Sequence, residues 1–179
     1  MGKSLVGKTS LIYKYLNNIC PSEHEPTIEG TYTTEITSEK GEERKFKIID
    51  TSGEENNQNF IEEWICNAHG FILVYSIDNK ESFEKIKKIF EFIKKNNCHK
   101  LPIVLVGNKS DMENDRKVAK QEAEEFAKLI SASYFELSAL KDDKEQCKTI
   151  FQLCANKIIK NDNDDNHHNH PKCYKCIIF

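Results

Sequence analysis

The sequence predicts an α/β fold: a mostly parallel sheet with helices on both faces. Two observations carry this prediction. Short, continuously apolar segments of strand length, such as residues 71–75 and 103–106, alternate with longer segments in which apolar residues recur at helical spacing. A strand that is apolar on both sides has to be buried on both sides, which is typical of parallel sheets between helices. With 179 residues, the chain fits one domain with one core.

The first half of the chain predicts a helix, a hairpin and a buried strand. Residues Lys40 and Gly41 separate two segments of alternating polarity and are typical of a hairpin turn. The run that follows residue 69 is apolar throughout, as a fully buried strand would be. The expected elements are, in order, a helix at 8–18, strands at 31–39 and 44–50, a short helix at 62–68 and a strand at 70–76.

The second half repeats the alternation of helix and strand. One strong apolar stripe supports the helix that follows the buried strand. The stripe consists of Phe83, Ile86, Ile89, Phe90 and Ile93. The expected elements are a helix at 81–95, a strand at 102–106, a helix at 118–130, a strand at 134–137 and a helix at 142–160. After residue 160 the composition changes to Asn, Asp and His, so we expect a domain at 1–160 and a flexible tail at 161–179.

Charge and cysteine content narrow the class of protein. The 26 cationic side chains face 29 acidic ones, which argues against a basic nucleic-acid binder. No apolar run approaches the roughly 20 residues of a membrane-spanning helix. Seven scattered cysteines do not form a disulfide framework, and this predicts a reducing, intracellular setting. We expect Cys66, Cys147 and Cys154 to be buried free thiols on apolar helix faces.

A phosphate-binding loop stands at the start of the chain. Residues 2–9 match the pattern G-x-x-x-x-G-K-S/T, in which backbone N–H groups wrap a phosphate at a helix N-terminus. Lys8 would reach the β- and γ-phosphates, and the Thr9 hydroxyl would bind Mg²⁺. The candidate nucleotide ligands here are Leu5, Val6, Gly7, Lys8, Thr9 and Ser10. Only Met1 precedes the motif, so we expect the sheet to lack the strand that ordinarily carries this loop.

Three more segments stand at the ends of expected strands, where open α/β sheets bind ligands. A D-x-x-G segment begins at Asp50, whose carboxylate can hold Mg²⁺ through water, and ends at Gly53, whose N–H can meet a γ-phosphate. An N-K-x-D segment ends at Asp111, which can accept from the guanine N1–H and exocyclic amine. Adenine has no such donor pair, so discrimination of roughly 10⁴ is expected. The third segment, Glu-Leu-Ser-Ala at 136–139, ends the last expected strand, where a backbone N–H could bind the guanine O6. The candidate base-contacting residues are Asn108, Lys109, Asp111, Ser138, Ala139 and Leu140.

These four motifs in this order resemble the Ras-type small GTPases over residues 1–160, and most closely the Ras, Rap and Rheb branch. Residues 26–32 are similar to the effector segment of that branch, and residues 70–76 and 106–109 are similar to its strands. The resemblance implies the phosphate-loop NTPase fold of a Ras-like G domain, truncated at its N-terminus. It also implies GTP and GDP as ligands, with Mg²⁺.

The resemblance further implies a switch. Thr27 is similar to the switch I threonine that binds Mg²⁺ and the γ-phosphate, Pro26 would contact the nucleotide beside it, and Gly53 is similar to the switch II hinge. Loss of the γ-phosphate would release both segments. Lys8, Thr27, Gly53 and Glu54 would form the catalytic set, and Thr9, Thr27 and Asp50 the metal ligands. Expected partners are effectors at residues 24–32, an exchange factor and an activating protein, with the chain itself a monomer.

Several residues depart from the family pattern. Glu54 replaces the usual Gln, and an ionised carboxylate cannot donate a hydrogen bond to the γ-phosphate, so we expect slow GTP hydrolysis. Ser4 stands where the family often has Gly and could crowd an arginine from an activating protein. Cys20 replaces an aromatic platform for guanine and Leu140 replaces a covering Lys, which predicts weaker binding and faster exchange.

The last four residues, Cys-Ile-Ile-Phe, form a C-a-a-X box that predicts geranylgeranylation of Cys176. A single lipid is a marginal anchor, and Cys173 is the candidate for a second one by palmitoylation. Together these lipids would place the protein on the cytoplasmic face of the plasma membrane or endomembranes. A competing hypothesis is a metal site in the tail, formed by His167, His168, His170, Cys173 and Cys176.

Two alternatives to a switch remain open. Glu54, Ser4 and the missing strand favour an interaction module that holds GTP with little turnover or holds no nucleotide. An ATP-using phosphate-loop enzyme is the other alternative, and the segment from Asn108 to Asp111 argues against it.

Overall fold

The structure is a computed structural model that describes residues 1–19, 29–39, 41–51, 53, 64–96, 98–164 and 175–179. The strands are β1 (Glu29–Thr37), β2 (Glu43–Thr51), β3 (Gly70–Ser76), β4 (Ile103–Asn108), β5 (Ser133–Leu137) and β6 (Lys175–Ile178). The α-helices are α1 (Lys8–Asn17), α3 (Lys80–Lys95), α4 (Lys120–Leu129) and α5 (Lys144–Asp164). Two 3₁₀ helices, η1 (Cys98–Lys100) and η2 (Ser110–Asp115), and a helical turn at 64–67 complete the described elements.

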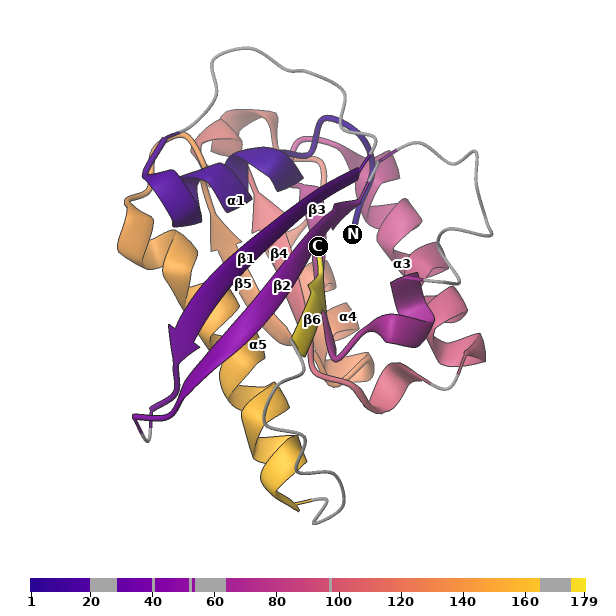
Figure 1. Ribbon diagram of the computed structural model, residues 1–179. Helices are drawn as coiled ribbons and strands as arrows, with labels where there is room; N and C mark the ends of the chain where they lie inside the picture. Colours follow the sequence, from indigo (N-terminus) through magenta and orange to yellow (C-terminus); the bar gives the residue numbers. More distant parts are fainter. Residues whose placement is uncertain (20–28, 40, 52, 54–63, 97, 165–174) are drawn as a thin grey trace.

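All six strands belong to one sheet with the order β1-β2-β6-β3-β4-β5 (Figure 1). Only β1 and β2 are antiparallel, and the remaining neighbours in the sheet are parallel. The hairpin turn between β1 and β2 includes Gly41, whose φ of 83° is a left-handed conformation that suits glycine. The predicted mostly parallel sheet is therefore confirmed, with the antiparallel hairpin at one edge.

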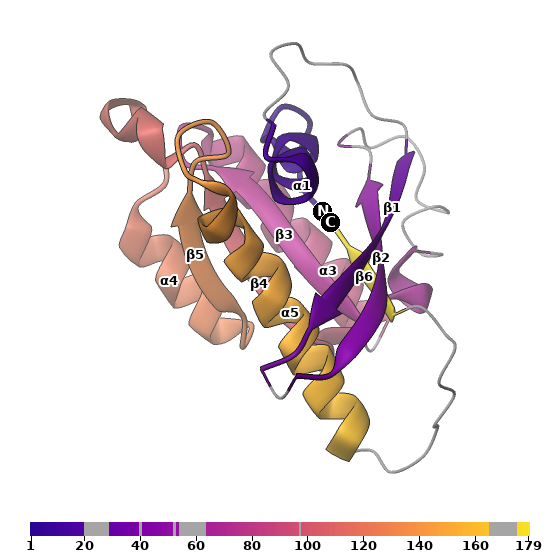
Figure 2. The ribbon, with the colours of Figure 1, turned by 60° about the vertical axis from the view of Figure 1, so that its left-hand side comes forward.

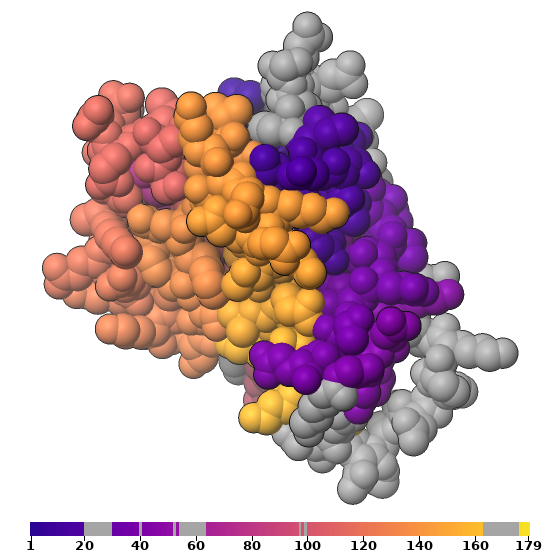
Figure 3. All heavy atoms as spheres, turned by 90° about the vertical axis from the view of Figure 1, so that its left-hand side faces the viewer, coloured from indigo at the N-terminus to yellow at the C-terminus, as the bar shows by residue number. Residues whose placement is uncertain are grey.

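Helices cover both faces of the sheet (Figure 2). One apolar core joins α1 and α5 to one face, and a second joins α3 and α4 to the other. In Figure 3, α5 (orange to yellow) is flanked by α4 on one side and by α1 and the hairpin on the other. The predicted stripe of α3 is buried at Phe83, Ile86, Ile89 and Ile93. None of the described helices is both long enough and apolar enough to span a membrane.

The C-terminus corrects the expected tail. Helix α5 continues to Asp164, beyond the expected domain boundary at residue 160, and residues 175–178 form strand β6 instead of a free tail. Strand β6 pairs with β2 from Phe46↔Lys175 to Ile49↔Ile178, and with β3 at Gly70↔Ile177 and Phe71↔Ile178. The physical reason is that Cys-Ile-Ile-Phe is apolar on both faces, as a buried parallel strand has to be.

The expected gap before the phosphate loop is filled by both chain ends. No strand precedes α1 within residues 1–7, yet the Met1 amine donates to the Ile72 carbonyl, and the Val74 N–H donates to the Met1 carbonyl over 2.7 Å. Met1 thus continues along β3 from the point where β6 stops. Figures 1 and 2 show the two termini side by side between β2 and β3.

The cysteines differ in part from the expectation. Cys147 and Cys154 of α5 are buried free thiols, as predicted. Cys66 is exposed because the helical turn at 64–67 places Ile65, and not its neighbour, against the core.

Candidate functional site

The phosphate loop curls over the end of β3 and leads directly into α1. Gly7 is the residue before the helix and has a left-handed φ of 88°. A Cβ atom at Gly2 would lie 2.1 Å from the Val74 carbonyl oxygen, so only glycine fits there. Leu5 also has a positive φ, 66°, without being glycine, which costs roughly 1–2 kcal/mol. The sequence motif does not mark this strained position, because Leu5 falls on one of its variable places.

Lys8 is the buried cation of the loop. Its side chain is only 6% exposed, and its Nζ donates to the carbonyls of Gly2 and Lys3 over 3.1 Å each. Burial lowers the pKa of Lys8 to about 8, with the charge of Lys85 acting in the same direction and that of Asp50 opposing it. A phosphate group would supply the negative charge that this ammonium lacks in its buried position.

Two of the three residues expected at a metal, Thr9 and Asp50, are in contact, and the third, Thr27, lies outside the described residues. The Thr9 hydroxyl donates to Asp50 Oδ2 over 2.6 Å, and Asp50 lies fully buried near the end of β2. The other oxygen, Asp50 Oδ1, is buried without a hydrogen-bond partner. Burial raises the pKa of Asp50, while the Thr9 hydrogen bond and the charge of Lys8 oppose that rise. An unsatisfied carboxylate oxygen beside a hydroxyl suits Mg²⁺, which prefers oxygen ligands.

Gly53 lies directly against the phosphate loop. A Cβ atom at this position would meet Ser4 N at 2.1 Å and Ser4 Cα at 2.4 Å, so a larger residue is excluded. The Gly53 carbonyl accepts a hydrogen bond from Lys85 Nζ of α3 over 2.8 Å. The structure therefore joins the D-x-x-G and phosphate-loop motifs, and adds a lysine that sequence reasoning missed.

Asn108 connects the phosphate loop to the expected base-binding end. Its side chain is 1% exposed, donates through Nδ2 to the Val6 carbonyl over 2.7 Å, and accepts at Oδ1 from the Ala139 N–H over 3.1 Å. A Cβ atom at Gly7 would lie 2.3 Å from this amide nitrogen. One buried side chain thus holds three of the four sequence motifs at the same edge of the sheet.

The remaining base-binding candidates surround Asn108. Lys109 precedes η2 with a left-handed φ of 65°, and its Nζ lies 3.9 Å from Asp78. Asp111 is exposed in η2. The Ser138 hydroxyl accepts from the N–H groups of Leu140 and Lys141, which shapes the turn after β5. Leu140 is 63% exposed and so presents apolar surface at this edge.

Arg116 braces this end of the site and was not identified from the sequence. Its guanidinium forms ion pairs with Glu113 over 2.6 Å and with Glu136 over 2.9 Å. Burial by itself raises the pKa of Glu136, but hydrogen bonds from Arg116 and Tyr134 outweigh this and hold the pKa below its usual value. The brace connects the loop after η2 to β5 and thereby fixes the two base-binding segments relative to each other.

Some expected residues are not part of this assembly. Ser10 lies in α1, and Cys176 lies in β6, where it is 7% exposed. Outside the described residues lie Cys20, Pro26, Thr27, Glu54 and Cys173, together with the three histidines of the metal hypothesis. The described residues therefore bring together the phosphate loop, Asp50, Gly53 and the base-binding segments.

Comparison with known proteins gives a consistent answer. The model of the Ras family matches residues 1–160. The chain is 32% identical over 161 residues to the GTP-binding protein Rheb homolog of Dictyostelium discoideum, covering 89% of this chain and 85% of that protein. It is 35% identical over 164 residues to the Rheb homolog of Drosophila melanogaster, covering 91% and 88%. It is 36% identical over 140 residues to human Ras-related protein R-Ras, covering 78% and 64%. The chain therefore belongs to the Ras family of small GTPases, enzymes that hydrolyse GTP.

Proposed function

We propose that this chain is a GTP/GDP switch that hydrolyses GTP slowly, requires Mg²⁺ and is anchored to a membrane by a prenyl group. The observation that carries the nucleotide part is the Asn108 bridge between Val6 and Ala139. It holds the phosphate loop beside the segments expected to bind guanine, so one nucleotide can contact both.

The chain's own residues divide the work of binding. Lys8 offers a buried ammonium to the β- and γ-phosphates, and Thr9 with Asp50 would hold the metal ion. When bound, Mg²⁺ neutralises negative charge on the phosphates. Asp111 accepts from the guanine ring, and the Ala139 segment offers backbone N–H groups to O6.

Hydrolysis is the attack of water on the γ-phosphorus, with GDP as the leaving group. Glu54 is acceptor-only when ionised, and therefore positions water less well than an amide that also donates to the γ-phosphate. The chain has two arginines, and Arg116 is engaged with Glu113 and Glu136. Strong stimulation of GTP hydrolysis would therefore need an arginine from an activating protein. The output of the switch is binding to effectors through residues 24–32. Thr27 is released after hydrolysis, which ends this binding. An exchange factor then replaces GDP by GTP on the monomer.

The anchor is a thioether at Cys176. Its sulfur attacks C1 of geranylgeranyl diphosphate, a C–S bond forms, diphosphate leaves and the thiol proton passes to solvent. Palmitoylation of Cys173 would supply the second lipid that stable anchoring needs. This would hold the protein on the cytoplasmic face of the plasma membrane or endomembranes.

An interaction module with little or no turnover is the second candidate. The close contact of Gly53 with Ser4 favours it, because it places switch II against the phosphate loop.

Released nucleotide tests the proposal directly. The purified chain is denatured, and the supernatant is analysed by ion-exchange chromatography. We expect about one equivalent of GDP or GTP per chain. Asp111→Asn should abolish guanine binding and favour xanthosine diphosphate, whereas the control Asp115→Asn, an exposed acid of the same 3₁₀ helix, should retain GDP.

Turnover separates the two candidates. Single-turnover hydrolysis should be faster in Glu54→Gln than in the unmodified chain. A Glu54→Gln variant that is no faster would contradict slow hydrolysis caused by Glu54, and absence of any bound nucleotide would support the interaction module instead.

A further inference from the structure

The C-terminal segment is packed as a core strand. Its side chains alternate between the two cores: Ile177 and Phe179 face α1 and α5, and Cys176 and Ile178 face α3. The last three residues are fully buried, and Cys176 is 7% exposed. The Phe179 ring stacks on Phe151 of α5 with centroids 5.2 Å apart. This is the packing of an interior strand and not of a loosely adsorbed tail.

Specific hydrogen bonds hold the segment in register. The Phe179 N–H donates to the Ile49 carbonyl over 2.8 Å, and the Phe179 carbonyl accepts from the N–H and the hydroxyl of Thr51 over 3.2 and 2.8 Å. On the other side, the Cys176 N–H donates to His69 Nδ1 over 3.1 Å, and the His69 N–H donates to the Cys176 carbonyl over 2.8 Å. Both edges of the strand are therefore paired.

Lipidation and this packing cannot occur together. Transfer of a prenyl group requires the Cys176 sulfur to reach a carbon atom outside the protein, and the transferred chain then remains on that sulfur. Burial also raises the pKa of the Cys176 thiol to about 11, so little thiolate is present in the sheet. A branched lipid of this size has no place in a close-packed core.

We propose that residues 175–179 are a detachable strand of the sheet, which buries Cys176 when docked and has to leave the sheet before the thiol can be lipidated. The second half of this proposal rests on the lipid anchor of the proposed function, and the first half does not. The segment has only five residues, and the apolar burial gained on docking is of the same order as the conformational entropy lost. The released state is therefore a minor but accessible population.

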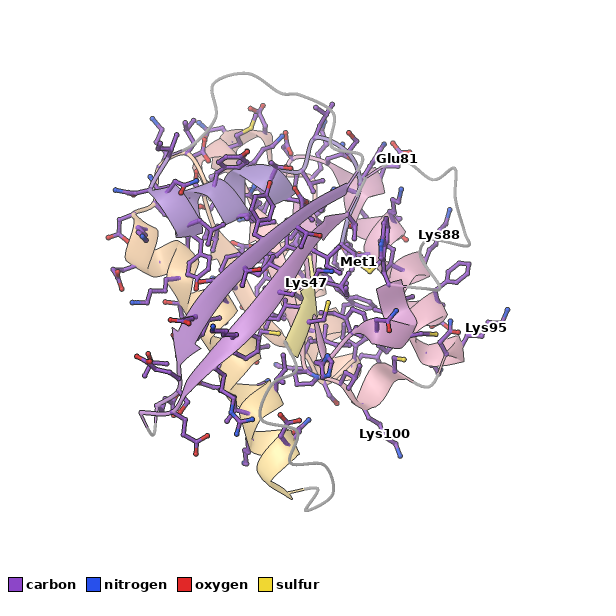
Figure 4. The ribbon with its side chains drawn as sticks, viewed as in Figure 1. Met1, Lys47, Glu81, Lys88, Lys95 and Lys100 are labelled. Atoms are coloured by element: carbon purple, nitrogen blue, oxygen red, sulfur yellow. The ribbon has the colours of Figure 1, made fainter. Side chains whose placement is uncertain are left out.

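The docked strand also touches the nucleotide site. Thr51, which donates twice to Phe179, directly follows Asp50 in β2. Met1, whose carbonyl accepts from the Val74 N–H, lies near the end of β6 (Figure 4). Docking thus supports the end of β2 that carries Asp50, and by linkage a ligand that binds through Asp50 should favour the docked state.

Thiol alkylation tests the docked state without any lipid. The chain of residues 1–179, without an affinity tag, is loaded with Mg²⁺ and GDP and treated with N-ethylmaleimide. Mass spectrometry follows the alkylation of each cysteine. The exposed Cys66 is the reference within the same molecule. We expect Cys176 to react at least about 100-fold more slowly than Cys66, because reaction waits for local opening. Equal rates would overturn the docked strand.

Two variants outside the C-a-a-X box release the strand from different sides. His69→Ala removes the acceptor of the Cys176 N–H, and Phe151→Leu removes the ring that stacks on Phe179. Each should raise the alkylation rate of Cys176 by about 5- to 30-fold with little change at Cys66. Ile93→Val, a buried substitution in α3, is the control for general destabilisation. A rise of equal size in this control would contradict specific release.

Prenyl transfer then tests whether docking of the strand prevents lipidation of Cys176. Geranylgeranyl diphosphate and a type I geranylgeranyltransferase are offered to the whole chain, to His69→Ala and to a peptide of residues 165–179. We expect the peptide to be modified fastest, His69→Ala next and the unmodified chain slowest. Equal rates for chain and peptide would overturn the exclusion. If Cys176 resists alkylation in the chain and the peptide accepts no lipid, lipidation is wrong both here and in the proposed function. The docked strand would still be supported by the alkylation result.

Discussion

The two ends of the candidate nucleotide site are held by different kinds of interaction. At the base-binding end, side chains do the positioning: Asn108 is hydrogen-bonded to Val6 and Ala139, and Arg116 is paired with Glu136. At the phosphate end, main-chain pairing is added to side-chain contacts: Met1 pairs with β3 and Phe179 with β2. The base-binding end is thus supported by side chains, and the phosphate end in addition by the main-chain pairing of residues 1 and 179.

This difference has a physical consequence. A side-chain network that joins three elements opens only when those elements separate, whereas a terminal strand can leave the sheet while the rest of the fold persists. We therefore expect the base-binding end to be the more rigid one.

Lys8 is the most important single residue of the phosphate end. Lys8→Met should weaken GDP binding by about 100-fold or more, because a buried charge-assisted contact to phosphate is lost. Isothermal titration calorimetry on nucleotide-free protein measures the change. If Lys8→Met bound GDP as tightly as the unmodified chain, the phosphate-loop assignment would be wrong.

The unmodified chain and Lys8→Met should also differ in how their GDP affinity depends on pH. The pKa of Lys8 without nucleotide is about 8, and a bound phosphate raises it. Because the pKa of Lys8 is higher in the complex, the contribution of its ammonium to GDP affinity is complete below pH 8. Above pH 8 the GDP affinity falls, by up to about tenfold per pH unit. Lys8→Met should lack this slope, while any titration of the guanine ring would affect both proteins equally.

Asn108 tests the connection between the two ends. Asn108→Ala would leave the buried Val6 carbonyl and the Ala139 N–H without partners, at a cost of about 2–5 kcal/mol in the free energy of unfolding. Urea denaturation measures this loss, and nucleotide affinity should fall with it. An Ala variant of unchanged stability would mean that the two ends are not joined through this amide.

Arg116 tests the brace at the base-binding end, and the chain offers its other arginine as a matched control. Arg116→Met should lower the free energy of unfolding by about 2 kcal/mol, since its partner Glu136 is only 12% exposed and would lose its counter-charge. Arg44 pairs with Glu42 and Asp162 at the surface, so Arg44→Met should cost at most about 1 kcal/mol. Equal losses would show that Arg116 is an ordinary surface arginine.

A substitution at Leu5 should have the smallest effect, and it should raise the stability of the protein instead of lowering it. Leu5→Gly should raise the free energy of unfolding by about 0.5 kcal/mol, because relief of the left-handed strain exceeds the added entropy of the unfolded chain. Leu129 is also exposed but lies in α4, so Leu129→Gly should lower stability by about 1 kcal/mol. Opposite signs in thermal denaturation would support the strain at Leu5.

Most of the fold could be predicted from the sequence because its signals are local. The stripe of α3, the apolar runs of β3 and β4, and the loop before α1 each lie within a single segment. Strand β6 could not be predicted in this way, since Cys-Ile-Ile-Phe is too short to distinguish a strand from a lipidation box. Its partners lie far away in the sequence, at Ile49 and Phe71.

The candidate site shows the same division. The residues of the four motifs could be named from the sequence, because each motif is contiguous. The residues that position them could not, because Arg116, Lys85 and Thr51 act across the fold through partners such as Glu136, Gly53 and Phe179. Cys66 was placed on the wrong side of its helical turn because a single turn has too few residues to define a face.

The meeting of Met1 and Phe179 also governs how this protein can be labelled. A reporter fused to either residue has to leave from between β2 and β3, and would disturb the pairing of Met1 with β3 or of β6 with β2. The hairpin turn is the opposite case, because a Cβ atom at Gly41 meets no atom within 4 Å. A fluorescent domain inserted at that turn would leave both ends of the chain in place and would be the neutral way to follow the protein in a cell.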